Sequence, residues 1–298
     1  MSPPPLVADG LGKRFRRDWA LRDLTLTIPK GAVVGLAGPN AAGKSTLLAL
    51  AAGMLAPSEG SIAVLGRDPR EAPEVLAEVG YVGQGAPLYR SFRVADTIEY
   101  ARRTNSRWDR DIALELLTRI DSRSKVSALS AGERARLALA LALGKRPRLV
   151  LLDEPFASLD PLAGRELLQL LMDGVAELGA TVVVASHVVA DIQRVCDHIV
   201  LLSSGCVRLE GNVEELLESH RLLTGPRRPL GSIRGVREIV RERHSGRQLT
   251  LLAIADGPIV DPSWTIDPVS LEELLLAYMA PERLPMPAAE RVPLRWHG

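Results

Sequence analysis

The sequence has little of several features that would each assign it to a class of protein. Only two of its 298 residues are cysteines, and the spacing of Cys196 and Cys206 fits neither a disulfide framework nor a metal site. No apolar run approaches the roughly 18 residues of a membrane-spanning helix. The N-terminal segment MSPPPLVADG lacks the basic and apolar regions of a signal peptide. We therefore expect a cytoplasmic protein that needs another chain to act across a membrane.

Net charge is also lacking, because 37 Lys and Arg residues balance 36 Asp and Glu residues. This balance gives no overall electrostatic footprint for nucleic acid. A basic segment, residues 102–107, has no interleaved aromatic residue beyond Trp108, which favours a solvated loop over a nucleic-acid patch. A chain of this length has room for one large domain and one small domain.

The segment GPNAAGKST, residues 38–46, fits the phosphate-binding pattern G-x-x-x-x-G-K-[ST]. Residues 32–37 before it predict a buried parallel strand, and the Leu/Ala-rich residues after it predict a helix. In that context backbone N–H groups of the loop and helix start point at phosphates. We expect Lys44 to reach the β- and γ-phosphates and Ser45 to ligate Mg²⁺. The other expected loop contacts are Gly38, Pro39, Asn40, Ala41, Ala42, Gly43 and Thr46.

Polar residues follow three further predicted strands. Ligands of open α/β sheets bind at the carboxyl ends of strands, so Gln84 could reach a bound ligand there. Asp153 suits Mg²⁺ held through Ser45 and water, and Glu154 suits the orientation of an attacking water. His187 could touch a γ-phosphate. These strands are expected over residues 79–84, of which Gln84 is the last, and over residues 149–152 and 181–186.

Ser130 and Glu133 have the spacing of a capping box and predict a helix start. This helix start could be a second phosphate site, because it offers free N–H groups, a hydroxyl and the nearby Gly132. It could equally be a well-capped helix and nothing more, and the spacing of the residues does not choose between the two. Near the N-terminus, Phe15 or Trp19 could stack on an adenine ring or could pack in the fold.

In this order the motifs resemble those of the ATPase subunits of ATP-binding cassette (ABC) transporters, over about residues 6–217. The resemblance implies an α/β fold, a P-loop NTPase cassette with a RecA-like core, an N-terminal antiparallel β region and a helical subdomain. The matching elements are GPNAAGKST (Walker A), Gln84 (Q-loop), LSAGE at 129–133 (signature), LVLLDEP at 149–155 (Walker B), SLD at 158–160 (D-loop) and His187 (switch histidine).

The resemblance also implies that two cassettes face head to tail, with each ATP between the phosphate-binding loop of one and the signature of the other. Glu154 would activate water, and His187 would hold the γ-phosphate. Phe15 would stack on adenine. Gln84 would link the nucleotide to the membrane subunit. The implied signature and D-loop contacts are Ser130, Ala131, Gly132, Glu133 and Asp160, and the implied Mg²⁺ site is Ser45, Gln84 and Asp153.

Three residues depart from the family pattern. Ala41 replaces a glycine of the phosphate-binding loop, and we expect binding to survive because alanine costs only a methyl group if its φ is negative. Ala131 replaces the first glycine of the signature pair. Glu133 replaces a glutamine, and its carboxylate could weaken nucleotide binding or be turned away by a capping role.

The predicted domains are residues 1–221, an ABC ATPase with a helical subdomain at about 88–147, and residues 222–280, a small C-terminal α+β appendage. Residues 224–229 are expected to form a linker, and residues 247–255 a strand. Ser270 is expected to cap a last helix with Glu273. Residues 281–298 are expected to be a loosely ordered tail.

We therefore expect an ATPase that drives transport through a separate integral membrane subunit, working as a homodimer on the inner face of the cell membrane without nucleic acid. The segment between Gln84 and Leu129 resembles that of bacterial exporters. The alternative is a soluble ABC-type ATPase acting on nucleic acid or ribosomes, a class that usually has a second cassette, a long coiled coil or zinc motifs. A non-hydrolysing module would lack Glu154 or His187.

Overall fold

The computed structural model describes residues 3–227 and 233–279 of the chain. The chain divides into two compact units, Met1–Glu214 and Glu215–Gly298. The predicted tail, residues 281–298, lies outside the described residues. Within the two described ranges, no helix has the length and apolar character needed to cross a bilayer.

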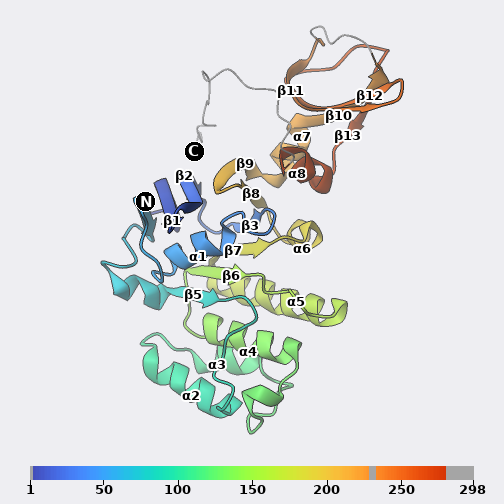
Figure 1. Cartoon of the computed structure of the whole chain (residues 1–298). Helices are drawn as coiled ribbons and strands as arrows, with labels where there is room; N and C mark the ends of the chain where they lie inside the picture. Colours follow the sequence, from blue (N-terminus) through green and yellow to red (C-terminus); the bar gives the residue numbers. More distant parts are fainter. Residues whose placement is uncertain (1–2, 228–232, 280–298) are drawn as a thin grey trace. The chain divides into compact units, whose positions relative to one another are not determined.

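A six-stranded sheet forms the centre of the first unit (Figure 1). Its first five strands are parallel, and the last is antiparallel to its neighbour. Three of them, β6, β7 and β3, are buried along their whole length, as runs of valine and leucine in a covered parallel sheet should be. In spatial order the strands are β5 (Val79–Val82), β6 (Leu149–Asp153), β7 (Thr181–Ser186), β3 (Val33–Ala37), β8 (His198–Ser203) and β9 (Cys206–Asn212).

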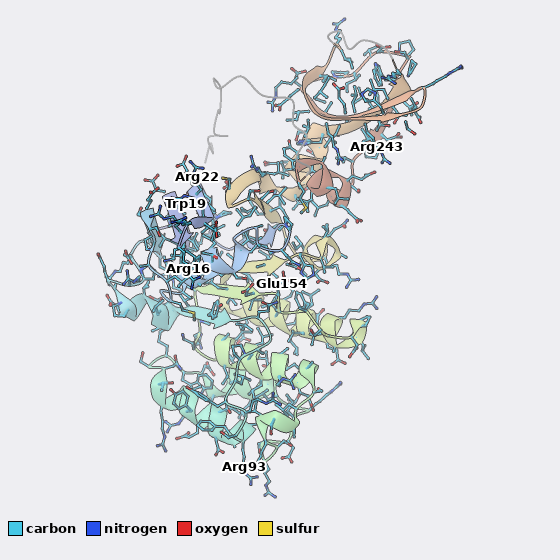
Figure 2. All side chains as sticks on the ribbon, in the orientation of Figure 1. Arg16, Trp19, Arg22, Arg93, Glu154 and Arg243 are labelled. Atoms are coloured by element: carbon cyan, nitrogen blue, oxygen red, sulfur yellow. The ribbon has the colours of Figure 1, made fainter. Side chains whose placement is uncertain are left out.

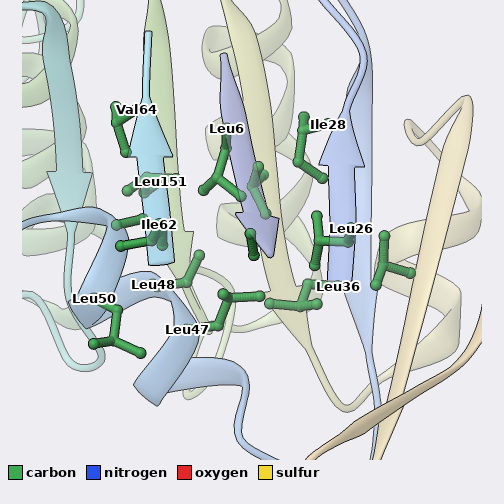
Figure 3. Packing of buried hydrophobic residues seen from close by; sticks show 14 of the residues in the cluster. Leu6, Leu26, Ile28, Leu36, Leu47, Leu48, Leu50, Ile62, Val64 and Leu151 are labelled. Carbon is green, nitrogen blue, oxygen red and sulfur yellow. The ribbon is translucent and has the colours of Figure 1, made fainter. Parts of the chain in front are cut away.

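The predicted antiparallel β region is confirmed. Strand β1 (Leu6–Phe15) lies between β2 (Asp18–Ile28) and β4 (Glu59–Val64). Leucine, isoleucine and valine side chains from these strands pack with helix α1 (Lys44–Ala51) in one buried cluster (Figure 3). Members of this cluster that are labelled in the figure include Leu6, Leu26, Ile28, Leu36, Leu47, Leu48, Ile62 and Leu151.

Most of the described helices lie in the first unit. Asp109 caps α3 by accepting hydrogen bonds from the N–H groups of Asp111 and Ile112. This helix ends at Glu115, because tighter turns take over, such as the hydrogen bond from Leu117 N–H to the Leu114 carbonyl. The helical elements after α1 in this unit are η1 (Pro73–Glu78), α2 (Val94–Thr104), α3 (Arg110–Glu115), η2 (Val126–Ala128), α4 (Ala131–Leu143), α5 (Pro161–Leu178) and α6 (Val189–Gln193). Helix α7 (Val213–Ser219) begins at the end of the first unit and continues into the second.

The second unit is an antiparallel sheet with one helix after it. Its strands are ordered β11 (Val236–Ser245), β12 (Gln248–Ala255), β10 (His220–Pro226) and β13 (Thr265–Pro268). Helix α8 (Leu271–Met279) begins at the predicted capping box, where the Ser270 N–H donates to Glu273 Oε2 at 3.0 Å and the Glu273 N–H donates to Ser270 Oγ at 3.2 Å.

The linker predicted over residues 224–229 is wrong for its first part, because residues 224–226 continue strand β10. Gly225 marks close packing there and not a turn. A Cβ at this position would lie 2.6 Å from the ring of Trp264, so only glycine lets the indole cover the strand. The glycine and prolines of this segment are equally typical of a linker, so the sequence alone does not reveal that Gly225 packs against Trp264.

Ala41 adopts a positive φ of 63°. The sequence-based expectation assumed a negative φ, and this assumption is wrong. A left-handed backbone brings Cβ close to the following carbonyl oxygen and costs an alanine roughly 1–2 kcal/mol. The neighbouring Ala42 has no positive φ and is only 2% exposed. The loop therefore holds one alanine where glycine would fit better and one where alanine is suitable.

We expect Ala41→Gly to raise the free energy of unfolding of the first unit by about 1 kcal/mol, because glycine adopts the left-handed conformation without strain. Ala42→Gly is the matched control, and should lower the same quantity by about 1 kcal/mol through the added freedom of the unfolded chain. Urea unfolding of both variants measures the two changes. Changes of the same sign would contradict this account of the loop.

Candidate functional site

Three neighbouring strands of the central sheet end beside one another. Strand β7 lies between β6 and β3, and all three run parallel. The phosphate-binding loop follows β3 at the edge where β6 ends in Asp153 and Glu154 and where His187 follows β7. This edge is the candidate active site, and Glu154 is labelled there in Figure 2.

Lys44, the first residue of α1, is held by the loop and by a carboxylate. Its Nζ donates to the carbonyl oxygens of Gly38 at 2.7 Å and Pro39 at 3.2 Å. The same atom lies 3.7 Å from Oε1 of Glu154. Burial lowers the pKa of Lys44, whereas the charges of Glu154 and Asp153 act to raise it. The oxygens of a bound polyphosphate would favour the charged ammonium in the same way.

Ser45 and Asp153 form the second polar contact of the site. Ser45 Oγ donates to Asp153 Oδ1 at 3.0 Å. Burial raises the pKa of Asp153, the hydrogen bond from Ser45 lowers it, and the charge of Glu154 raises it further. A hydroxyl and a carboxylate oxygen this close together are an oxygen-only donor set, which fits a hard divalent cation such as Mg²⁺.

The Glu154 carboxylate connects Lys44 with the switch histidine. Its Oε2 lies 2.9 Å from Nδ1 of His187, and the residue is 8% exposed. The backbone of Glu154 adopts a φ of 51°. This left-handed conformation is held by a hydrogen bond of 3.0 Å from the Glu154 N–H to the carbonyl oxygen of Ala185 on β7. The carboxylate is therefore fixed between the ammonium and the imidazole.

Two glycines of the phosphate-binding loop are required by close backbone packing. A Cβ on Gly38 would lie 2.3 Å from the carbonyl oxygen of Leu202, and one on Gly43 would lie 2.5 Å from Cδ2 of Leu21. Their φ values are 151° and 106°. The loop between them exposes Pro39, Asn40 and Ala41, buries Ala42 and leads into Thr46 in the first turn of α1. The first N–H groups of α1 have no acceptor within the helix, which suits a phosphate.

Gln84 follows β5, the strand beside β6, and is exposed. With Glu154 and Ala131 it lines a cavity of about 270 Å³. The structure therefore brings Gln84 to the same edge as the other site residues. Hydrogen bonds among the described residues do not include its side-chain amide, so its predicted contact with a metal ion stays a prediction.

The helix start at Ser130 is a complete capping box. The Glu133 N–H donates to Ser130 Oγ at 3.2 Å, and the Ser130 N–H donates to Glu133 Oε2 at 2.8 Å. The Glu133 carboxylate is thus turned back onto its own helix. A Cβ on Gly132 would lie 3.2 Å from Cβ of Ala163, so this glycine lets α4 approach α5. In residues 3–227, no hydrogen bond joins this helix start to Lys44.

Asp160 caps α5, where its Oδ1 accepts from the N–H groups of Leu162 and Ala163 at 3.0 Å each. It lines a second cavity of about 580 Å³ together with Glu154 and His187. Asp160 therefore lies on the same cavity as Glu154 and His187, although its carboxylate is engaged by its own helix.

Sequence reasoning missed Asp191, which lines the same cavity four residues beyond His187. Burial raises the pKa of Asp191, and the charge of Glu154 adds to that rise. It also missed Tyr81, whose pKa is raised by burial and by Asp153. The sequence does show an acidic residue four positions after His187, and that spacing could have identified Asp191. No feature of the sequence points to Tyr81, because its proximity to Asp153 depends on the pairing of β5 with β6.

The β1–β2 hairpin lies against the phosphate-binding loop, since Gly43 meets Leu21 and the carbonyl oxygen of Ala20. Phe15 ends β1 and is 46% exposed, whereas Trp19 is half-buried. The hairpin that carries both aromatic residues thus contacts the loop through Ala20 and Leu21, and Phe15 is the more exposed of the two aromatic residues.

Comparisons with known proteins agree with this geometry. A family model described as ABC transporter matches residues 21–157. The ABC transporter ATP-binding protein YtrB of Bacillus subtilis is 32% identical over 212 residues, which cover 70% of this chain and 73% of YtrB. The Nod factor export ATP-binding protein I of Rhizobium johnstonii is 34% identical over 226 residues, with 73% and 72% covered. The sulfate/thiosulfate import protein CysA of Synechocystis sp. is 33% identical over 221 residues, covering 72% of this chain and 62% of CysA.

Solved structures give the same assignment. The structure of an ATP binding subunit of an ABC transporter has a TM-score of 0.65 and 26% identity, covering 72% of this chain and 92% of that one. The dimeric ATP-binding cassette MJ0796, bound to ADP and Pi after hydrolysis, has a TM-score of 0.63 and 27% identity, covering 70% and 98%. The predicted cassette fold is confirmed, and the chain belongs to the ABC transporter family as an ATP-hydrolysing, ATP-binding subunit.

Proposed function

We propose that this ABC transporter ATPase energises export through a separate integral membrane subunit on the inner face of the cell membrane. The observation that carries the catalytic part is the Glu154 carboxylate, held between Lys44 Nζ at 3.7 Å and His187 Nδ1 at 2.9 Å. Export is supported by the segment between Gln84 and Leu129 and by the similarity to a Nod factor export protein. Relatives with import names have similar identities, so a transport assay decides the direction.

In the proposed reaction, a water oxygen attacks the γ-phosphorus of ATP while the bond to the β–γ bridging oxygen breaks, yielding ADP and inorganic phosphate. Glu154 orients that water and accepts its proton. Lys44 exchanges its contacts with the Gly38 and Pro39 carbonyls for phosphate oxygens. His187 turns from Glu154 toward the γ-phosphate, which its 46% exposed side chain allows.

Mg²⁺ would be held by Ser45 Oγ and the Asp153 carboxylate, with Gln84 at the same sheet edge. When bound, the cation neutralises charge on the phosphate oxygens. The contribution of this chain is positional, since the hydrogen bond between Ser45 and Asp153 already places two oxygen ligands 3.0 Å apart.

A second copy of the chain would complete the site. Ser130 is exposed at the start of α4, where free N–H groups and the hydroxyl could receive the γ-phosphate of a partner's ATP. Asp160 is exposed at the start of α5 in the same unit. The dimeric form of the similar cassette MJ0796 supports this arrangement.

Glu154→Gln should retain ATP binding and slow turnover at least about 100-fold, because the amide cannot accept the proton of the attacking water. Phosphate release and nucleotide binding measure the two effects separately. Glu177→Gln, which changes an exposed carboxylate of α5, is the control and should turn over normally. Unchanged turnover in Glu154→Gln would exclude Glu154 as the base.

Ser130→Arg should leave binding of ATP to the monomer intact and abolish ATP-driven dimerisation, because the long side chain fills the helix start that would meet the partner's phosphate. Size-exclusion chromatography with ATP in the Glu154→Gln background measures this. Ser270→Arg, the same change at the other Ser-x-x-Glu cap of the chain, controls for loss of a cap and should dimerise normally. A normal dimer with Ser130→Arg would refute the in-trans role.

Co-purification from native membranes tests the transport assignment. A polytopic membrane protein that remains bound to the chain supports it, and ATP-driven movement of solute out of cells would then establish export. Recovery of ribosomes or nucleic acid without a membrane protein would instead favour the soluble alternative, which no feature of the described site supports.

A further inference from the structure

We propose that Lys13 is a positioning residue for the nucleotide base, because it holds one face of the Phe15 ring and leaves the other face open to adenine. This inference rests on the proposed function, since a base is brought here only by a triphosphate in the loop at residues 38–46. It concerns the affinity for the base and not the chemistry at the γ-phosphate.

Strand β1 carries two cation–aromatic pairs. Lys13 Nζ lies 5.2 Å from the ring centroid of Phe15, and the guanidinium carbon of Arg14 lies 5.4 Å from that of Trp19. The register shift between Lys13 and Arg14 adds a residue, Ala20, on β2 and none on β1. Successive residues of β1 therefore still point to opposite faces, so Lys13 and Phe15 share one face and Arg14 lies on the other. Trp19 is labelled beside Arg16 and Arg22 in this part of the molecule in Figure 2.

The pairing of β1 with β2 identifies which face meets the phosphate-binding loop. Lys13 is paired with Leu21 across the two strands, and directly paired residues have their side chains on the same face. Leu21 is fully buried, and its Cδ2 lies 2.5 Å from the position of a Cβ on Gly43. The face of Lys13 and Phe15 is therefore the one that adjoins the start of α1.

The Lys13 ammonium is held by a hydrogen bond to a residue outside the hairpin. Its Nζ donates at 2.8 Å to the carbonyl oxygen of Ala56, in the segment that follows α1. The ammonium is thereby fixed over Phe15, whose ring remains 46% exposed. Trp19 differs, because its ring lies 3.0 Å from the position of a Cβ on the buried Gly12 and so packs against the neighbouring strand. Phe15 is therefore the stacking residue, and Lys13 orients it.

The test compares ATP with inorganic tripolyphosphate, which has the phosphates but no base. Lys13→Met should raise the Kd of ATP at least about threefold, the size of an exposed cation–π contact, and leave the Kd of tripolyphosphate unchanged. Lys13→Arg should restore ATP affinity because it keeps a cation over the ring. A role of Lys13 in folding alone would weaken both ligands together, and that result would overturn the proposal.

Arg14→Met is the matched control, because it removes the corresponding cation from Trp19, and it should leave both Kd values unchanged. Loss of ATP affinity in Arg14→Met with normal affinity in Lys13→Met would overturn the proposal and assign the base to Trp19. Failure of the wild-type chain to bind either ligand would overturn the proposed function itself, whereas failure of this inference alone leaves wild-type binding intact.

Discussion

The parallel arrangement of β6, β7 and β3 is the constraint on which the rest of the structure depends. These strands are buried on both faces, so the side chains along them are apolar. Polar groups are tolerated only where the strands end, and parallel strands all end at one edge. Side chains that are separated by more than 100 positions in the chain, such as Ser45 and Asp153, therefore meet at hydrogen-bond distance.

The charges at this edge are nearly excluded from water. Lys44, Asp153 and Glu154 are 6%, 4% and 8% exposed. An unpaired charge at such depth would cost several kcal/mol, so each one needs a partner. Lys44 and Glu154 partner each other, and Lys44 also donates to the carbonyl oxygens of Gly38 and Pro39. Ser45 contacts Asp153, and His187 contacts Glu154. The site is preorganised for a triphosphate, because phosphate oxygens can replace the polar contacts that these side chains already make.

Three residues with side chains at this site have a left-handed backbone. Ala41, Glu154 and Ser158 have φ values of 63°, 51° and 68°. Each left-handed conformation at a residue with a side chain costs roughly 1–2 kcal/mol, and such residues persist where the surrounding packing over-determines them. In Glu154 this conformation accompanies the turn that places the carboxylate between Lys44 and His187. The strain at Ala41 has no comparable contact in the described structure.

The sequence by itself determined the local chemistry of this protein. Runs of valine and leucine specified buried strands, the Gly-Lys-Ser loop specified a phosphate site, and the caps at Ser130 and Ser270 specified where helices begin, because each depends on neighbours within a few residues. Tertiary structure decided the sign of φ at Ala41, the strand made by residues 224–226 and the contact of Lys13 with the carbonyl oxygen of Ala56. Those outcomes depend on packing between segments, and a linear pattern of residue types does not contain it.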